Sequence, residues 1–149
     1  MGLTVLLCTD GSEPAAAALA EGLGVLGDPD RVVLATVIEP LDPTLVVGTG
    51  MAGGLLSPDE AQRQHDDRDT VARQALEATR AALGLPGAEL EVLAGQPGPA
   101  LCDLARDLPA SVVVLGTRGR GGLRRAVLGS VSDHVVRNAP CPVLTRGPA

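Results

Sequence analysis

The sequence contains no aromatic residue. Phe, Tyr and Trp are all missing from its 149 residues, although 45% of them are hydrophobic. A core must therefore be built from Val, Leu, Ile and Ala, and a bound planar ring must lie between aliphatic side chains and backbone. This disfavours nucleic-acid binding by base stacking on aromatic side chains. The net charge of −6 also disfavours general nucleic-acid binding, which usually requires a basic domain.

Cysteine is scarce, and long hydrophobic runs are missing. Cys8, Cys102 and Cys141 lie far apart without metal-ligand spacing, so we expect small buried hydrophobes in a reducing compartment instead of disulfides. The N-terminus has no basic segment, and its apolar run is too short for a signal peptide. No stretch approaches the length of a membrane span. We expect one cytoplasmic domain over residues 1–149, without a membrane partner.

Short apolar segments alternate with segments that have helical patterns. The expected strands are 3–8, 31–38, 88–95, 111–116 and 141–146, and the expected helices are 12–26, 57–84, 97–108 and 130–138. This order predicts an α/β fold, a parallel sheet with helices on both faces. Ligands of such sheets bind in a crevice at the carboxyl ends of the strands. The loops after the first and fourth strands should meet there.

A loop rich in glycine and arginine follows the fourth expected strand. Gly116 and Gly119 are followed, after nine intervening residues, by Gly129 and Ser130, where a helix begins. Glycines let backbone N–H groups point into one concavity, and a helix N-terminus adds unpaired donors and partial positive charge. Ser130 would either cap its helix or donate to a phosphate oxygen. Further charge for a polyphosphate would come from Arg118, Arg120, Arg124 and Arg125. The pattern indicates an anion cradle, and a solvated mobile loop is the alternative.

The chain resembles the universal stress protein family along essentially its whole length. The stretch GTRGRGGLRRAVLGSVSDHVV, residues 116–136, and the APCPVL that follows resemble the family's C-terminal signature, G-x2-G-x9-G-[ST]. VLLCTDGSEPA resembles its first strand and loop, and LATVIEP its second strand. The resemblance implies a five-stranded parallel, Rossmann-like sheet of the adenine nucleotide alpha hydrolase type and a homodimer. Members with the complete motif tend to bind ATP, so it also implies ATP binding.

The resemblance also implies which residues bind the triphosphate. The implied phosphate contacts are made by Gly119, Gly129, Ser130, Val131 and Ser132. Arg118 occupies a variable position that the resemblance places close to the phosphates, and its role there is inferred from its charge. Mg²⁺ would be held mainly by the nucleotide, since it retains waters and needs few protein ligands. We expect no metal site made by the protein alone.

The ribose and adenine sites are implied by residues after the first, second and fourth strands. Asp10 and Gly116 would lie near the ribose, and Val37 would meet the adenine edge through its backbone. Thr9 and Leu115 would line the cleft. For Asp10, the alternatives are an Asx-type bond between its loop and the first helix and a metal ion on the phosphates.

Several other features do not indicate a site. GTGMAG, residues 48–53, matches G-x-G-x-x-G but lacks the strand before it and the helix that opens within it. We interpret 39–57 as a loop beside the crevice and a candidate lid. His65 lies in a charged helical stretch and should be exposed, and His134 should serve packing or helix polarity. Neither has a Ser or Cys partner by spacing, so no catalytic triad is indicated. We interpret three carboxylates as a solvated helix face: Asp66, Asp67 and Asp69.

The first functional hypothesis is an ATP-binding, dimeric regulatory protein of the stress response. No residue is an obvious general base for attack on the γ-phosphate, so we do not expect an enzyme, although slow hydrolysis is compatible with the site. Dimerisation through the edge strand 141–146 would cover its unpaired backbone groups. One alternative is a nucleotide-free interaction module whose arginine loop contacts an acidic protein. Another is a cyclic AMP binder.

Overall fold

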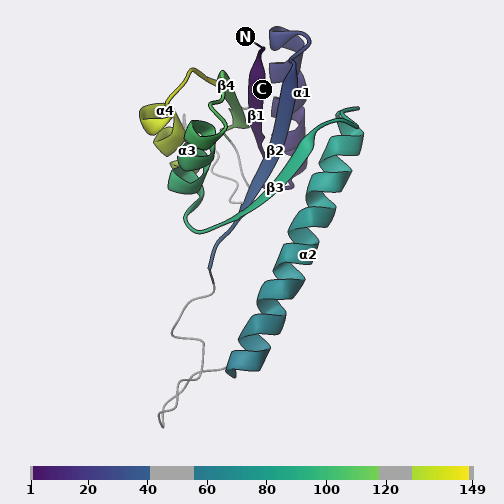
Figure 1. Ribbon diagram of the computed structural model, residues 1–149, viewed down its shortest axis with the longest axis vertical. Helices are drawn as coiled ribbons and strands as arrows, with labels where there is room; N and C mark the ends of the chain where they lie inside the picture. The colour runs from purple at the N-terminus through teal and green to yellow at the C-terminus, as the bar shows by residue number, and fades with distance from the viewer. Residues whose placement is uncertain (1, 41–55, 118–128, 148–149) are drawn as a thin grey trace.

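The computed structural model describes residues 2–40, 56–117 and 129–147, and it contains the expected parallel sheet (Figure 1). The strands are β1 (Thr4–Cys8), β2 (Arg31–Ile38), β3 (Glu89–Ala94), β4 (Val112–Gly116) and β5 (Val143–Arg146), in the order β3-β2-β1-β4-β5. All four pairs are parallel. The chain first winds from β1 towards β3 and then from β4 towards β5. The winding reverses between β1 and β4, and ligands of such sheets bind at this reversal.

Helices cover both faces of the sheet, as the sequence predicts. They are α1 (Glu13–Leu26), α2 (Pro58–Ala82), α3 (Pro97–Asp107) and α4 (Ser130–Asn138). Figure 1 shows α1 and α2 on one side of the sheet and α3 and α4 on the other. The alternation of side chains along β1 serves both layers. Val5 and Leu7 pack with Leu76 of α2, while Leu6 packs with Leu101 of α3.

Most elements lie within two or three residues of their expected bounds. The expected strand 141–146 is shorter, because pairing along β5 begins at Val143. Pro142 has no N–H to donate, although its carbonyl accepts a bond of 3.0 Å from Val113 N. The cysteines are free thiols, with Cys8 and Cys102 buried and Cys141 half-buried. Cys8 belongs to a buried hydrophobic cluster, as a small apolar group would, and this burial raises the pKa of its thiol.

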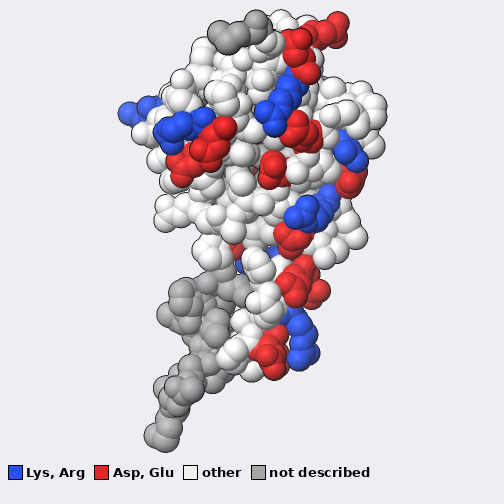
Figure 2. Space-filling view, viewed as in Figure 1, with Lys and Arg blue, Asp and Glu red and all other residues white. Residues whose placement is uncertain are grey.

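The N-terminal half of α2 extends past the carboxyl ends of the strands (Figure 1). A capping box fixes its start: Glu60 N donates to Ser57 Oγ over 3.2 Å, and Ser57 N donates to Glu60 Oε2 over 2.7 Å. The buried residues of the helix, Leu76 and Thr79, belong to its second half. Acidic and basic side chains alternate along its outer side (Figure 2). Within the described ranges, no helix is both long enough and apolar enough to cross a membrane.

Candidate functional site

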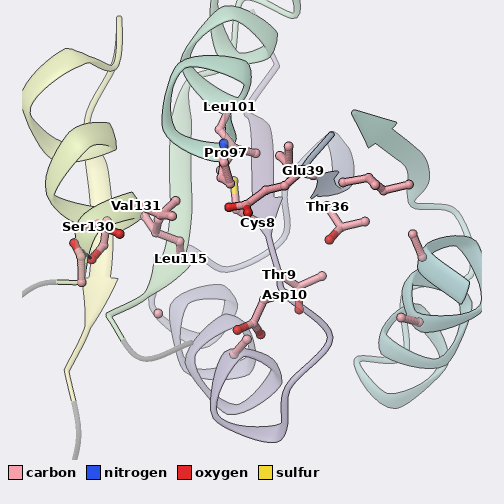
Figure 3. Close-up of a pocket in the computed structure, with 18 of the residues that line it drawn as sticks. Cys8, Thr9, Asp10, Thr36, Glu39, Pro97, Leu101, Leu115, Ser130 and Val131 are labelled. Atoms are coloured by element: carbon pink, nitrogen blue, oxygen red, sulfur yellow. Dashed lines mark hydrogen bonds between the residues drawn. The ribbon is translucent and has the colours of Figure 1, made fainter. Parts of the chain in front are cut away.

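A cavity of about 770 Å³ lies at the carboxyl edge of the sheet, within the size range of small-molecule binding sites. Its walls come from the ends of β1, β2 and β4, from the first turns of α3 and α4, and from the overhanging part of α2. Figure 3 shows side chains from these elements converging on one space. The reversal of strand order therefore coincides with a preformed pocket.

Nine of the eleven residues assigned to a nucleotide site by the sequence line this cavity. They are Thr9, Asp10, Val37, Leu115, Gly116, Gly129, Ser130, Val131 and Ser132. The other two, Arg118 and Gly119, lie outside the described residues. The same is true of the remaining arginines of the glycine loop and of 41–55 in the candidate lid. The structure thus brings the described part of the predicted site together in one place.

The loop after β1 is held by its own polar groups. Thr9 N donates to Ala35 O over 3.0 Å, which continues the sheet by one bond. Gly11 N donates to Thr9 Oγ1 over 3.0 Å, and Ser12 N donates to Asp10 Oδ1 over 2.9 Å. Gly11 has a φ of 82°, a conformation that favours glycine. Asp10 therefore makes the Asx-type bond that the sequence offers as one alternative, and it also lines the cavity.

The loop after β4 is held against the end of β5. Thr117 donates to Arg146 O twice, from its N over 3.1 Å and from its Oγ1 over 3.2 Å. A Cβ atom at Gly129 would lie 3.0 Å from Thr117 O. The φ of Gly129 is −72°, which any residue can adopt, so it is the close approach of the two backbone segments that favours glycine here.

Among the described residues, no side chain caps the first turn of α4. Gly129 is its N-cap residue, and no side-chain hydrogen bond caps the helix. Ser130 is therefore the first helical residue, so of the two roles open to it in the sequence, capping is wrong. Its side chain is exposed and lines the cavity. Ser132 is buried, and its hydroxyl donates to Gly129 O over 3.1 Å. Ser132 thus has its N–H, but not its hydroxyl, to offer a ligand.

The first turn of α3 also meets the cavity, but it presents few donors. Pro97 and Pro99 occupy its first and third positions, and proline has no backbone N–H. Pro97 and Leu101 give the cavity an apolar wall on this side. A charged phosphate is therefore better accommodated at α4, and an apolar ring is better accommodated at α3.

The wall provided by α2 was missed by the sequence analysis. Asp67 and Arg68 line the cavity, followed by Val71, Ala72 and Ala75. The interpretation of Asp67 as part of a solvated face is incomplete, because its exposed side chain borders the cavity. In the sequence, the spacing of residues 68, 71, 72 and 75 places them on one helix face. That spacing alone does not identify a cavity wall, because it does not say that the helix overhangs the strand ends.

The two histidines lie as expected. His65 is exposed, whereas the ring of His134 packs so closely on α3 that a Cβ at Gly98 would lie 2.7 Å from its Cγ. Within the ranges that the structure describes, no three His, Cys, Asp or Glu side chains are grouped to hold a metal ion.

Comparison with known proteins identifies the family. A sequence model of the universal stress protein family matches residues 1–145. A universal stress protein of Thermus aquaticus, encoded 3′ of a QAH/OAS sulfhydrylase, is 32% identical over 95% of this chain and 96% of its own. The universal stress protein UspA of Lactobacillus plantarum has the same fold, with a TM-score of 0.75, 22% identity and 96% of each chain covered.

Two further structures with this fold were solved with nucleotides. A universal stress protein in complex with cAMP gives a TM-score of 0.63 at 21% identity, covering 97% of this chain and 95% of that one. A universal stress protein family protein of Arabidopsis thaliana with AMP bound gives a TM-score of 0.57 at 17% identity. The match covers 99% of this chain and 92% of that one. These structures share the fold, while the family match over residues 1–145 and the Thermus aquaticus relative show the family: the chain belongs to the universal stress protein family.

Proposed function

We propose that this chain binds ATP in the cavity at the carboxyl edge and acts as a dimeric regulatory protein of the stress response. The observation that carries the proposal is the convergence of nine motif-assigned residues on one cavity. The AMP and cAMP complexes of proteins with this fold support an adenine nucleotide as the ligand class. Binding is the proposed role, and hydrolysis is not.

The parts of ATP match different parts of the cavity. The first turn of α4 offers N–H groups and the positive end of the helix dipole to phosphate oxygens, and the Ser130 hydroxyl lies beside them. Asp10 and Gly116 border the space for the ribose. The adenine would meet the backbone of Val37 and lie against Pro97. Mg²⁺ would be bound mainly through the phosphates.

The absence of Tyr and Trp makes the first test simple. The protein's own near-ultraviolet absorbance is very low, so an adenine nucleotide that co-purifies with it would dominate the spectrum. We expect mass spectrometry of the purified protein to detect ATP. We also expect calorimetry on nucleotide-free protein to show Mg²⁺–ATP binding more tightly than AMP or cAMP.

Other outcomes of this experiment have clear meanings. Tighter binding of cAMP than of ATP would favour the cyclic nucleotide, which a relative binds. Protein that neither carries nor binds any nucleotide would favour an interaction module with the same fold.

The free edge of β5 is the proposed dimer interface. The carbonyls of Pro142 and Arg146 accept bonds from the β4 side. Because backbone groups alternate in direction along a strand, Val143 and Thr145 direct their N–H groups away from β4. Pairing with a second copy would satisfy these donors.

A proline at an outward-facing N–H separates dimer formation from folding. We expect the wild type and Thr145→Ala to be dimers, and Thr145→Pro to be a monomer, by light scattering after gel filtration. The proline removes no bond to β4, and edge positions of this kind tolerate it. A dimeric Thr145→Pro protein would place the interface elsewhere.

Three free thiols fit a reducing compartment, and we place the protein in the cytoplasm.

A further inference from the structure

The cavity lies between two helical layers at its β2 end. Pro97 and Leu101 of α3 border it from one layer, and Arg68, Val71 and Ala72 of α2 border it from the other. These helices cover opposite faces of the sheet (Figure 1). A flat ligand at this end would therefore have one face towards α3 and the other towards α2.

The α2 wall lies opposite the first turn of α4. Helix α2 packs on β2 and β3, whereas α4 packs on α3 and β5. Strands β2 and β4 lie on either side of β1, so their ends are about 10 Å apart, twice the spacing of neighbouring strands. Figure 3 shows Ser130 and Val131 at one side of the cavity and the teal α2 at the other. With phosphates at α4, the base of a nucleotide lies at the α2 end.

Arg68 differs from the two arginines that follow it on α2, and unlike Arg63 it lines the cavity. Arg73 pairs with Asp69 over 2.8 Å, and Arg80 pairs with Glu77. Among the residues that the structure describes, Arg68 takes part in no ion pair or side-chain hydrogen bond, although it is half-buried. The other charged side chains lining the described cavity are acidic: Asp10, Glu39 and Asp67. Of the residues described, Arg68 is thus the cation that lines the cavity, and it forms no ion pair with Glu39 or Asp67.

A nucleotide base offers a flat face on which the guanidinium of Arg68 can stack. Bases in proteins commonly stack on aromatic rings or on guanidinium planes, and this chain has no aromatic residue. We propose that the guanidinium of Arg68 stacks on the face of the nucleotide base that lies away from Pro97 and Leu101. The contact would make Arg68 a determinant of affinity for the base, and it rests on the proposed nucleotide binding.

Two substitutions at Arg68 test the contact, with Arg63→Ala as the matched control. Arg63 is an exposed arginine on the same helix and does not line the cavity. Calorimetry would measure the affinity of nucleotide-free protein for Mg²⁺–ATP and, by competition, for inorganic triphosphate, which has no base. We expect Arg68→Ala to weaken ATP about tenfold, a typical size for loss of a stacking contact, and to leave triphosphate unchanged. Arg68→Lys keeps the charge but not the plane, so it should lose most of the same affinity. Arg63→Ala should bind ATP like the wild type.

The other outcomes overturn the inference in distinguishable ways. Equal losses for ATP and triphosphate in Arg68→Ala would show that Arg68 binds the phosphates. Wild-type affinity in Arg68→Lys would show that charge, and not stacking, is what matters. Wild-type ATP affinity in Arg68→Ala would reject the contact while nucleotide binding stands. A wild-type protein that binds no ATP would reject the proposed function itself.

Discussion

Helices α1 and α4 both begin at the carboxyl edge of the sheet, but their first turns are satisfied differently. At α1, Ser12 Oγ accepts a bond of 3.3 Å from Ala15 N, and Ser12 N is itself bonded to Asp10. At α4, the N-cap residue is Gly129 and no side-chain bond caps the turn. Position in the topology therefore does not by itself leave backbone N–H groups available to an anion, because the first turn must also lack a partner from the protein.

The two helices also differ in how they are packed. Gly22 brings α1 so close to β4 that a Cβ there would lie 2.4 Å from Val114 Cγ1. In α4, Val135 and Ser132 are the buried residues, while Ser130 remains exposed. Changes in α1 should therefore alter the free energy of unfolding, and changes in the first turn of α4 should alter ligand affinity.

The largest effect is expected at Gly129. A valine at this position collides with Thr117 O and moves the first turn of α4 away from its place in the cavity wall. We expect Gly129→Val to lower ATP affinity at least a hundredfold, on the order of 3 kcal/mol, with a much smaller change in stability. Calorimetry and denaturant unfolding would measure the two quantities. Gly87→Val is the control, because its Cβ meets nothing within 4 Å. Unchanged ATP affinity in Gly129→Val would remove α4 from the site.

A pair of glycines within α1 should show the opposite behaviour. Gly22→Ala overpacks the contact with Val114 and should destabilise the protein by about 1–3 kcal/mol. Gly24→Ala meets nothing within 4 Å and should stabilise it by about 0.5–1 kcal/mol, because alanine is the better helix former. Urea unfolding of both variants measures the difference. Equal stability of the two variants would mean that α1 lies further from β4 than described here.

The smallest effects are expected from two serines that can be matched directly. Ser12→Ala removes a cap and should cost about 1 kcal/mol of stability, with little change in ATP affinity. Ser130→Ala removes no cap, so stability should hold while ATP affinity falls about tenfold with the loss of a bond to a charged phosphate. Thermal unfolding and calorimetry on both variants complete the comparison. A destabilised Ser130→Ala protein with normal ATP affinity would reverse the assignment.

The fold was largely predictable from the sequence because its signals are local. The bounds of α4 agree with those expected, because Gly129 precedes its first residue and Pro140 follows shortly after its last. Both residue types are common just outside helices. The role of Ser130 was not predictable, because Gly129 and Ser130 are both acceptable N-cap residues, and only the backbone shows which one occupies that place.

The α2 wall could not be predicted for a different reason. Arg68 lies in a polar segment that reads as solvated, and a local pattern does not report where a helix passes relative to the strand ends. Its place beside the cavity depends on the packing of Leu76 and Thr79 further along the same helix. The cavity thus combines a motif that is legible in the sequence with a wall that only tertiary structure creates.

Thr117 contacts two elements outside its own loop, the edge strand β5 and the start of α4. Its N–H and its hydroxyl both donate to the carbonyl of Arg146, the last residue of the edge strand. Its own carbonyl lies against Gly129, the N-cap residue of α4. One buried residue therefore lies between the first turn of α4 and the end of the edge strand. A movement of the end of β5 would strain these two bonds and displace the carbonyl that packs against Gly129.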